Sequence, residues 1–238
     1  MDTNEKDLKV AVIPARGGSK RIPRKNIKEF CGRPIIAYSI EAAKNSGLFN
    51  EVMVSTDDEE IAELARRFGA STPFPRSTAA AGDYATTTDV LLEVLENYRE
   101  QGCLFSKLCY VYPTAPFVTA EKLRQACQLL EESRMDALLP VVEFSYPPLR
   151  GLTITEGRLR MKWPENEFVR SQDLETVYHD CGQFCFIRTE ALLRERTILC
   201  RNMIPMVLPA LEVQDIDNET DWELAELKYE LLKRKGLL

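Results

Sequence analysis

The first 70 residues alternate short apolar segments with amphipathic ones, and this order constrains the fold more than any other feature of the sequence. Residues 10–14 and 51–56 are short and β-branched, as buried parallel strands are. A helix is expected after Pro34 and ends at Gly47, and a second, capped by Asp57 and Asp58, covers residues 59–68 and ends at Gly69. Strand–helix–strand–helix order is typical of parallel strands joined by crossover helices. The chain is therefore predicted to be an α/β protein with a mainly parallel central sheet.

The same alternation continues and is interrupted once. Helices are predicted over residues 89–98 and from Thr119 to about Ser133, with strands over residues 108–112 and 137–142. Residues 143–180 contain prolines and two short alternating runs (residues 152–155 and 159–163), which indicate an inserted arm with a hairpin. Residues 183–187 and 206–213 are expected to resume the sheet, and a final helix begins near Thr220. Residues 1–238 are interpreted as a single domain, with 143–180 as the insertion.

Composition removes several classes of function. The net charge of −6 argues against bulk nucleic-acid binding, which favours a basic surface. No apolar run approaches the roughly 20 residues of a membrane helix, and the polar N-terminus is not a secretory signal, so a cytoplasmic protein with no membrane partner is expected. His179 is the single histidine, which excludes multi-histidine zinc sites. The seven cysteines form no CxxC pair and indicate reduced thiols.

A basic loop directly follows the first predicted strand. Residues 16–28 carry no acidic residue and six basic ones: Arg16, Lys20, Arg21, Arg24, Lys25 and Lys28. Backbone N–H groups around Gly17, Gly18 and Ser19 are candidates for an anion nest, and the lysines and arginines for neutralising a polyphosphate. The loop matches neither the P-loop nor the dinucleotide pattern. The alternative is a basic loop that is simply exposed to solvent.

A pair of acidic residues precedes the last predicted helix. On an extended segment, Asp215 and Asp217 share one face with Ile216 buried behind them. Two carboxylates suit a hard cation such as Mg²⁺, which prefers oxygen ligands and keeps water for substrate phosphate. The alternative is helix capping, because Asp217, Asn218 and Thr220 lie just before the helix. A phosphate-binding loop upstream favours the metal interpretation.

Several segments, in order along nearly the whole chain, resemble one enzyme family. Residues 13–26 (IPARGGSKRIPRKN) are similar to the N-terminal signature of the CMP-sugar-acid synthetases, the acylneuraminate cytidylyltransferases, and residues 54–57, 112–116 and 215–217 agree with it. Residues 170–174 (RSQDL) and 178–184 (YHDCGQF), together with Arg21, resemble the pseudaminic acid cytidylyltransferases in particular. Many neuraminate enzymes have glutamine where Tyr112 stands and glycine where Arg21 stands.

The resemblance implies a reaction, a fold and an assembly. CTP is joined to the anomeric hydroxyl of a nine-carbon 2-keto sugar acid, and pyrophosphate is released. The implied fold is a three-layer Rossmann-like nucleotidyltransferase, usually a homodimer in which the inserted arm helps to close the partner's sugar site. The implied substrates are CTP and a nonulosonic acid, and the implied cofactor is Mg²⁺.

The resemblance also implies roles for individual residues. The CTP site is expected to comprise Arg16, Gly17, Gly18, Ser19, Lys25, Asn26 and Arg76. Asp215 and Asp217 fall on the magnesium pair and, with Arg16 and Lys25, form the expected catalytic set, with Asp217 the principal ligand. For the sugar, a guanidinium pairs well with a carboxylate, so Arg170 is the candidate cation. Gln172, Tyr178, His179 and Gln183 are candidate contacts to hydroxyl and N-acyl groups, and for His179 the alternative is a purely structural role.

Alternatives for the substrate stay open. The same reaction on legionaminic or N-acetylneuraminic acid is the nearest one. A sugar-1-phosphate nucleotidyltransferase shares the sheet and basic loop but has no carboxylate for residues 170–183 to bind. A non-catalytic nucleotide-binding module does not require the Asp215 and Asp217 pair.

Overall fold

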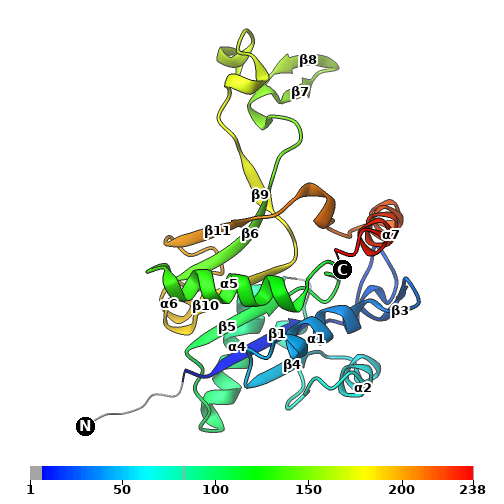
Figure 1. Cartoon of the computed structure of the whole chain (residues 1–238), viewed down its shortest axis with the longest axis vertical. Coiled ribbons are helices and arrows are strands. Elements are labelled where there is room, and N and C mark those ends of the chain that lie inside the picture. The colour runs from blue at the N-terminus through cyan, green and yellow to red at the C-terminus, as the bar shows by residue number, and fades with distance from the viewer. Residues whose placement is uncertain (1–6, 83, 238) are drawn as a thin grey trace.

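The computed structural model describes residues 7–82 and 84–237, and its core is a seven-stranded sheet in the order β11-β6-β10-β5-β1-β4, with β9 paired to β6 (Figure 1). The strands are β1 (Lys9–Pro14), β4 (Glu51–Ser55), β5 (Lys107–Val111), β6 (Ala137–Glu143), β9 (Tyr178–Asp180), β10 (Phe184–Arg188) and β11 (Met203–Val207). β1 is parallel to β4 and β5, β11 is parallel to β6, and β10 is antiparallel to both β5 and β6. Five strands therefore share one direction, which confirms the mainly parallel sheet.

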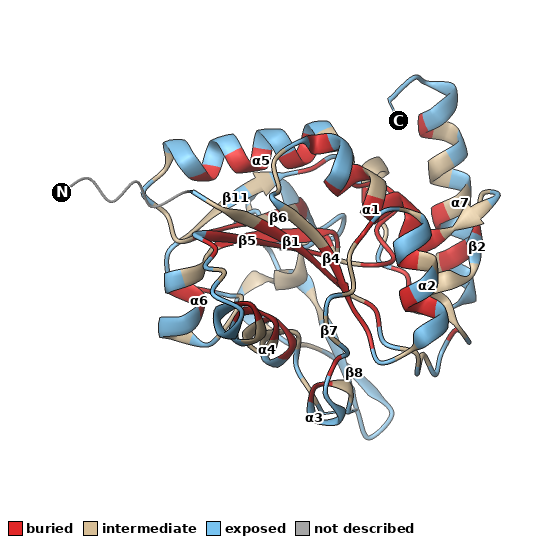
Figure 2. Ribbon diagram, turned by 90° about the horizontal axis from the view of Figure 1, so that it is seen from below, coloured by how far each residue is buried: buried red, intermediate tan, exposed pale blue. Residues whose placement is uncertain are grey.

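Helices cover both faces of this sheet. The α-helices of the described chain are α1 (Ile35–Ser46), α2 (Glu59–Arg67), α3 (Thr78–Ala81), α4 (Thr87–Glu100), α5 (Ala120–Glu132), α6 (Thr189–Glu195) and α7 (Glu219–Arg234). Along β1, Ala11 and Ile13 pack in the apolar cluster that includes α1, α2 and α5, whereas Val10 and Val12 pack in the cluster that includes α4 and α6. Figure 2 shows the buried strands between α1 and α5 on one side and α4 on the other. Burial on both faces explains why β1 is apolar throughout.

The helix starts follow from local capping chemistry. Of the two predicted caps of α2, Asp58 acts as the cap by accepting from the N–H of Ile61, whereas Asp57 accepts from the N–H of Gly17. Thr119 caps α5, the helix that was predicted to start at this residue. Helix α4 begins earlier than predicted, because Thr86 and Asp89 form a capping box. The short helices α3 and α6 were not predicted, since four and seven residues are too few to show a helical period.

Two further sequence-based boundaries are wrong. The strand predicted over residues 206–213 is β11, which ends at Val207; Pro209 has no N–H for a ladder, and the chain turns into a 3-10 helix, η5 (Ala210–Glu212). The insertion predicted over residues 143–180 is shorter, because Glu143 pairs with Tyr178 and Val141 with Asp180. The ends of the predicted insertion thus belong to the sheet, and the arm comprises residues 144–177.

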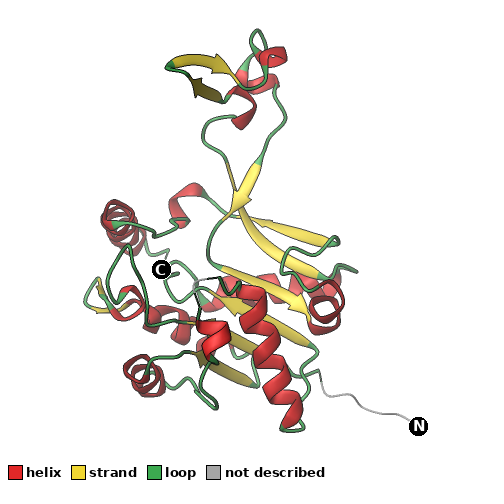
Figure 3. Cartoon of the chain, turned by 180° about the vertical axis from the view of Figure 1, so that it is seen from behind, coloured by secondary structure: helices red, strands yellow, loops and turns green. Residues whose placement is uncertain are grey.

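The arm stands away from the sheet along the long axis of the molecule (Figures 1 and 3). It carries an antiparallel hairpin, β7 (Leu152–Thr155) and β8 (Arg158–Met161), where the alternating runs predicted one. Large apolar side chains on it are exposed, including Tyr146 (87%), Ile154 (76%) and Phe168 (92%). Surface of this kind is typical of an interaction site.

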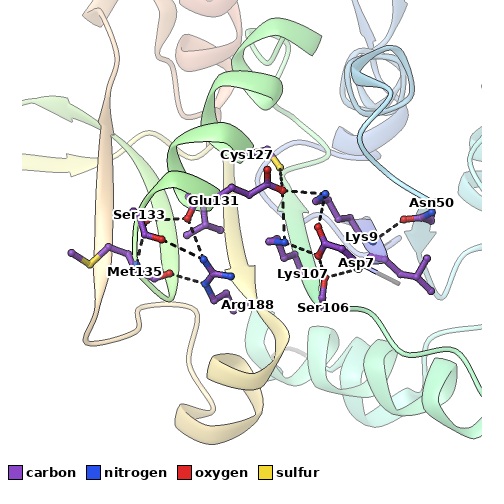
Figure 4. Close-up of polar contacts among 12 residues, drawn as sticks. Asp7, Lys9, Asn50, Ser106, Lys107, Cys127, Glu131, Ser133, Met135 and Arg188 are labelled. Carbon is purple, nitrogen blue, oxygen red and sulfur yellow. Dashed lines mark hydrogen bonds and ion pairs between the residues drawn. The ribbon is translucent and has the colours of Figure 1, made fainter. Parts of the chain in front are cut away.

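A charged network closes the sheet at the amino ends of β1 and β5 (Figure 4). Lys107, only 6% exposed, donates to Asp7 at 2.6 Å, and Lys9 lies 2.9 Å from Asp7 and 3.1 Å from Glu131. The Lys107 ammonium, with a hydrogen bond from Ser106, holds the pKa of Asp7 well below its usual range. The network occupies the amino ends of the parallel strands. Their carboxyl ends, at the opposite end of the sheet, are therefore the ones available for binding a ligand.

Helix α7 is fixed beside the basic loop by aromatic packing. Phe30, from the small hairpin of β2 (Glu29–Phe30) and β3 (Arg33–Pro34), lies 5.6 Å from the rings of both Tyr38 and Trp222 and 5.5 Å from that of Tyr229. Edge-to-face pairs of this kind stabilise a fixed arrangement.

Within the described residues, no helix is both long and apolar enough to cross a membrane.

Candidate active site

A cavity of about 520 Å³ opens at the carboxyl ends of β1 and β5. Pro14 ends β1, Tyr112 follows β5, and Thr87 begins α4, so three elements meet at its wall. Ligands of open α/β sheets bind in this position, because the loops that follow parallel strands converge there. Its lining contains five cations (Arg16, Lys20, Arg21, Lys25 and Arg76) and, among the described residues, no aspartate or glutamate. The cavity is therefore suited to a polyanion.

Most of the expected CTP residues line this first cavity. The lining includes Arg16, Ser19, Lys25, Asn26 and Arg76, although Arg76 lies some fifty residues beyond the loop. Gly17 and Gly18 are not part of the lining. The N–H of Gly17 is donated to Asp57 at 3.1 Å, and that of Ser19 to the Gly17 carbonyl at 3.1 Å. Two of the three N–H groups of the expected anion nest are thus bonded within the protein in this structure.

The acidic turn after β4 holds the basic loop in place. Arg24, with a left-handed φ of 55°, forms ion pairs with Asp58 and Glu60. A Cβ on Gly17 would lie 2.7 Å from Asp58 Oδ2, so this close approach requires glycine. Asp58 therefore caps α2 and anchors the loop at once.

Arg76 contributes a buried positive charge. It is 8% exposed, and it donates from Nε to Ser55 Oγ at 3.1 Å and from Nη2 to the Ser55 carbonyl at 2.5 Å. Burial lowers the pKa of the guanidinium, and the opposite charge of Asp57 counters this in part. An arginine stays protonated in proteins, so a bound anion is favoured beside it.

A second cavity, of about 390 Å³, lies beside the first and is acidic. Its lining residues include Glu143, His179, Asp215, Asp217, Asp221 and Lys228. Lys25 connects the two cavities: it lines the first, and its Nζ donates to the Ile216 carbonyl at 2.5 Å and lies 3.7 Å from Asp217. Arg21, also from the first cavity, pairs with Asp217 at 2.8 Å.

The acidic pair has the predicted arrangement, and the capping alternative is wrong for Asp217. Ile216 is fully buried, whereas Asp215 and Asp217 line the cavity. Asn218 caps α7 in a capping box with Asp221, whose carboxylate also accepts from the N–H of Asp217 at 3.0 Å. The side chain of Asp217 is thus not used as a cap.

The pair fits a hard cation. Partial loss of hydration raises the pKa of Asp215, and the neighbouring charge of Asp217 raises it further. A divalent cation would relieve this repulsion. The described residues contain no group of three or more histidine, cysteine or acidic ligands. Mg²⁺ does not require one, since it commonly binds one or two carboxylates together with water and substrate phosphate.

The expected sugar residues are dispersed. Arg170 and Gln172 are exposed on the arm, and Arg170 pairs with Asp173 at 2.7 Å. Tyr178 and His179 lie on β9; His179 lines the second cavity, and its ring is 4.6 Å from that of Phe144. Gln183 is 1% exposed and donates to the Glu212 carbonyl at 2.6 Å, so it lines neither cavity.

Residues that sequence reasoning did not assign also belong to the site. Thr86, Thr87, Tyr110 and Tyr112 line the first cavity. Burial raises the pKa of Tyr112 to about 12, and the negative charge of Asp180 adds to this, so its hydroxyl remains a hydrogen-bond donor at neutral pH. The position of Tyr112 directly after a parallel strand was the available signal.

The basic and acidic cavities adjoin at the carboxyl ends of parallel strands, where open α/β sheets bind their ligands. The structure is similar to that of a CMP:2-keto-3-deoxy-manno-octonic acid synthetase complexed with CTP, with a TM-score of 0.66 and 17% identity, over 95% of this chain and 99% of that one. A sequence model described as "Cytidylyltransferase" matches residues 10–228, and the chain belongs to this family.

Two curated relatives match over similar lengths. The chain is 41% identical to the pseudaminic acid cytidylyltransferase of Campylobacter jejuni over 223 residues, 93% of this chain and 96% of that protein. It is 31% identical to the CMP-N,N'-diacetyllegionaminic acid synthase of Legionella pneumophila, over 93% of this chain and 96% of that protein.

Proposed function

We propose that this enzyme transfers the cytidylyl group of CTP to pseudaminic acid and releases pyrophosphate. The main support is the position of Lys25, which lines the basic cavity and contacts the loop of the acidic pair at Ile216. A nucleotide in the first cavity and an acceptor in the second would meet at this lysine. The relative named for this activity, at 41% identity over nearly full length, supports the choice of sugar.

The reaction forms a bond between the anomeric oxygen and the α-phosphorus as the bond to pyrophosphate breaks. Arg16, Ser19, Lys25 and Asn26 bind the triphosphate, and Arg76 binds near the cytidine and phosphates. Preorganised cations beside a leaving polyphosphate stabilise the charge that develops on it. The sugar hydroxyl releases its proton to water in the acidic cavity.

Asp215 and Asp217 would hold the Mg²⁺ ion. When bound there, the ion supplies Lewis acidity that lowers the pKa of a coordinated hydroxyl and neutralises phosphate charge. Arg21 and Lys25 orient the Asp217 carboxylate by their ion pairs with it. A histidine base is then unnecessary, and His179, with Tyr178, is left to contact the sugar.

The proposed enzyme is a cytoplasmic homodimer, with each chain a single domain. In it the arm of one protomer covers the sugar site of the other, bringing the partner's Arg170 to the sugar carboxylate and the partner's Gln172 to its polar groups. The exposed apolar side chains Tyr146, Ile154 and Phe168 support this assembly, because a partner would remove them from water.

The test is a pyrophosphate-release assay with CTP, Mg²⁺ and single acceptors. We expect turnover with pseudaminic acid and at least tenfold lower kcat/KM with legionaminic and N-acetylneuraminic acids. Equal kcat/KM for pseudaminic and neuraminic acids would remove the sugar assignment. Turnover of sugar-1-phosphates alone would overturn the proposed reaction.

A further inference from the structure

The segment that carries Asp215 is held by side chains rather than by regular secondary structure. After β11 the chain makes one ladder-like bond, from the Leu208 N–H to the Val141 carbonyl, and then forms the 3-10 helix η5. Residues 213–217 belong to no helix or strand. The position of the Asp215 carboxylate therefore depends on contacts from neighbouring elements.

Lys228 of α7 makes the most extensive of these contacts. Its Nζ donates to the Val213 carbonyl at 2.7 Å, to Gln214 Oε1 at 3.0 Å and to the Ala210 carbonyl at 3.3 Å. These bonds account for the three donors of an ammonium group, and all three acceptors are neutral. No carboxylate among the described residues forms an ion pair with Lys228. Its ammonium group instead donates to residues 210–214, although the side chain also lines the acidic cavity.

Gln214 extends the contact to the metal-binding residue itself. While its Oε1 accepts from Lys228, its Nε2 donates to the Asp215 carbonyl at 3.1 Å. A continuous hydrogen-bonded path thus runs from α7 to Asp215. Trp222 and Tyr229 pack against Phe30, which follows the basic loop, and so hold α7 beside that loop. The path from Lys228 therefore links the position of Asp215 to the position of the basic loop.

The β9–β10 turn and helix α5 also support the segment. Gln183 donates to the Glu212 carbonyl at 2.6 Å, and the Glu212 carboxylate pairs with Lys122 at 2.7 Å. The segment is thereby held between the β9–β10 turn and helix α7. Lys228 supplies the helix side of this support.

We propose that Lys228 is a positioning residue for the metal-binding pair, acting through Gln214 on Asp215. The proposal rests on the assignment of Asp215 and Asp217 as metal ligands in the proposed function. Groups that orient metal ligands typically change metal affinity by about 10- to 100-fold when they are removed. A purely structural lysine would change stability and leave metal affinity alone.

The experiment compares Lys228→Met with Lys233→Met, which removes the same charge from an exposed site on the same helix, and with Lys228→Arg. Mn²⁺ binding to the CTP-free protein is titrated by electron paramagnetic resonance, well below the melting temperature of every variant. We expect Lys228→Met to raise the Kd for Mn²⁺ about tenfold, Lys233→Met to leave it unchanged, and Lys228→Arg to restore most of the affinity. If Lys228→Met does not fold, Gln214→Met interrupts the same path and is expected to show the same loss.

A Kd for Mn²⁺ that is the same in Lys228→Met and Lys233→Met would overturn the positioning role. The steady-state assay provides a second measurement: in Lys228→Met, kcat falls and rises again with excess Mg²⁺, whereas KM for CTP does not change. The binding titration needs no sugar. A failure of the proposed reaction, with no turnover by the wild type, is therefore distinguishable from a failure of this proposal.

Discussion

Gly182 offers a sharp test of the active-site geometry. It lies in the turn between β9 and β10 with φ of +62°, in the left-handed region that favours glycine. A Cβ added there would lie 3.3 Å from both Cγ and Oδ1 of Asp215. The substitution Gly182→Ala therefore strains the backbone and presses on a proposed metal ligand.

The two effects have separate magnitudes. A left-handed alanine costs about 1 kcal/mol, which lowers the melting temperature of a chain of this length by about 2–4 °C. A contact at 3.3 Å requires Asp215 to move by a few tenths of an ångström. Because a displacement of 1 Å costs about 100-fold in rate, we expect kcat to fall about fivefold. KM for CTP is expected to stay constant, since Gly182 does not line the first cavity.

Gly47→Ala is the matched control. Gly47 ends α1 with φ of +68°, and a Cβ there would meet no atom within 4 Å. The two variants should lose similar stability in thermal unfolding, and only Gly182→Ala should lose kcat in the pyrophosphate-release assay. Equal kcat in the two variants would refute the argument that the β9–β10 turn sets the position of Asp215.

Three further predictions address the acidic pair, the charged network and the arm. Asp217→Asn should reduce turnover at least about 100-fold with an unchanged circular dichroism spectrum; wild-type activity would refute the metal assignment. Asp7→Asn should lower the free energy of unfolding by roughly 1 kcal/mol at pH 7. Because folding lowers the pKa of Asp7, this difference should shrink as the pH falls below about 4, and urea denaturation that shows it constant from pH 7 to pH 2 would contradict the network. Phe168→Glu should shift a dimer towards monomer in sedimentation velocity, and an unchanged sedimentation coefficient would argue against an arm-mediated dimer.

Sequence patterns among neighbouring residues were sufficient to predict most of the strands, the helices and the arrangement of the acidic pair. The apolar run of β1 reflects burial on both faces, and the caps Asp58 and Thr119 act on N–H groups three residues away. The alternation of Asp215, Ile216 and Asp217 also depends only on neighbouring residues. Interactions of this range leave a readable signal in the sequence.

Local patterns were insufficient where a contact joins distant segments. Lys25 meets the Ile216 carbonyl across 191 positions of the chain, and no periodicity reports such a pair. Gln183 follows a polar stretch, yet it is buried because η5 folds over it and its carbonyl pairs with the N–H of Tyr112. Arg170 lies on an arm whose placement depends on the β6–β9 pairing rather than on its own residues.

By itself, the sequence determined that the chain forms a mainly parallel α/β sheet, that a basic loop follows the first strand, and that two carboxylates share one face near the C-terminus. Only the tertiary structure decided that the loop and the carboxylates adjoin, that Asn218 rather than Asp217 caps α7, and that Lys228 supports the acidic segment. The physical reason is the separation in sequence between the residues that interact. Periodicity and capping arise from neighbours in the chain, whereas a site assembled at a sheet edge depends on the packing of helices that the chain brings together from its two ends.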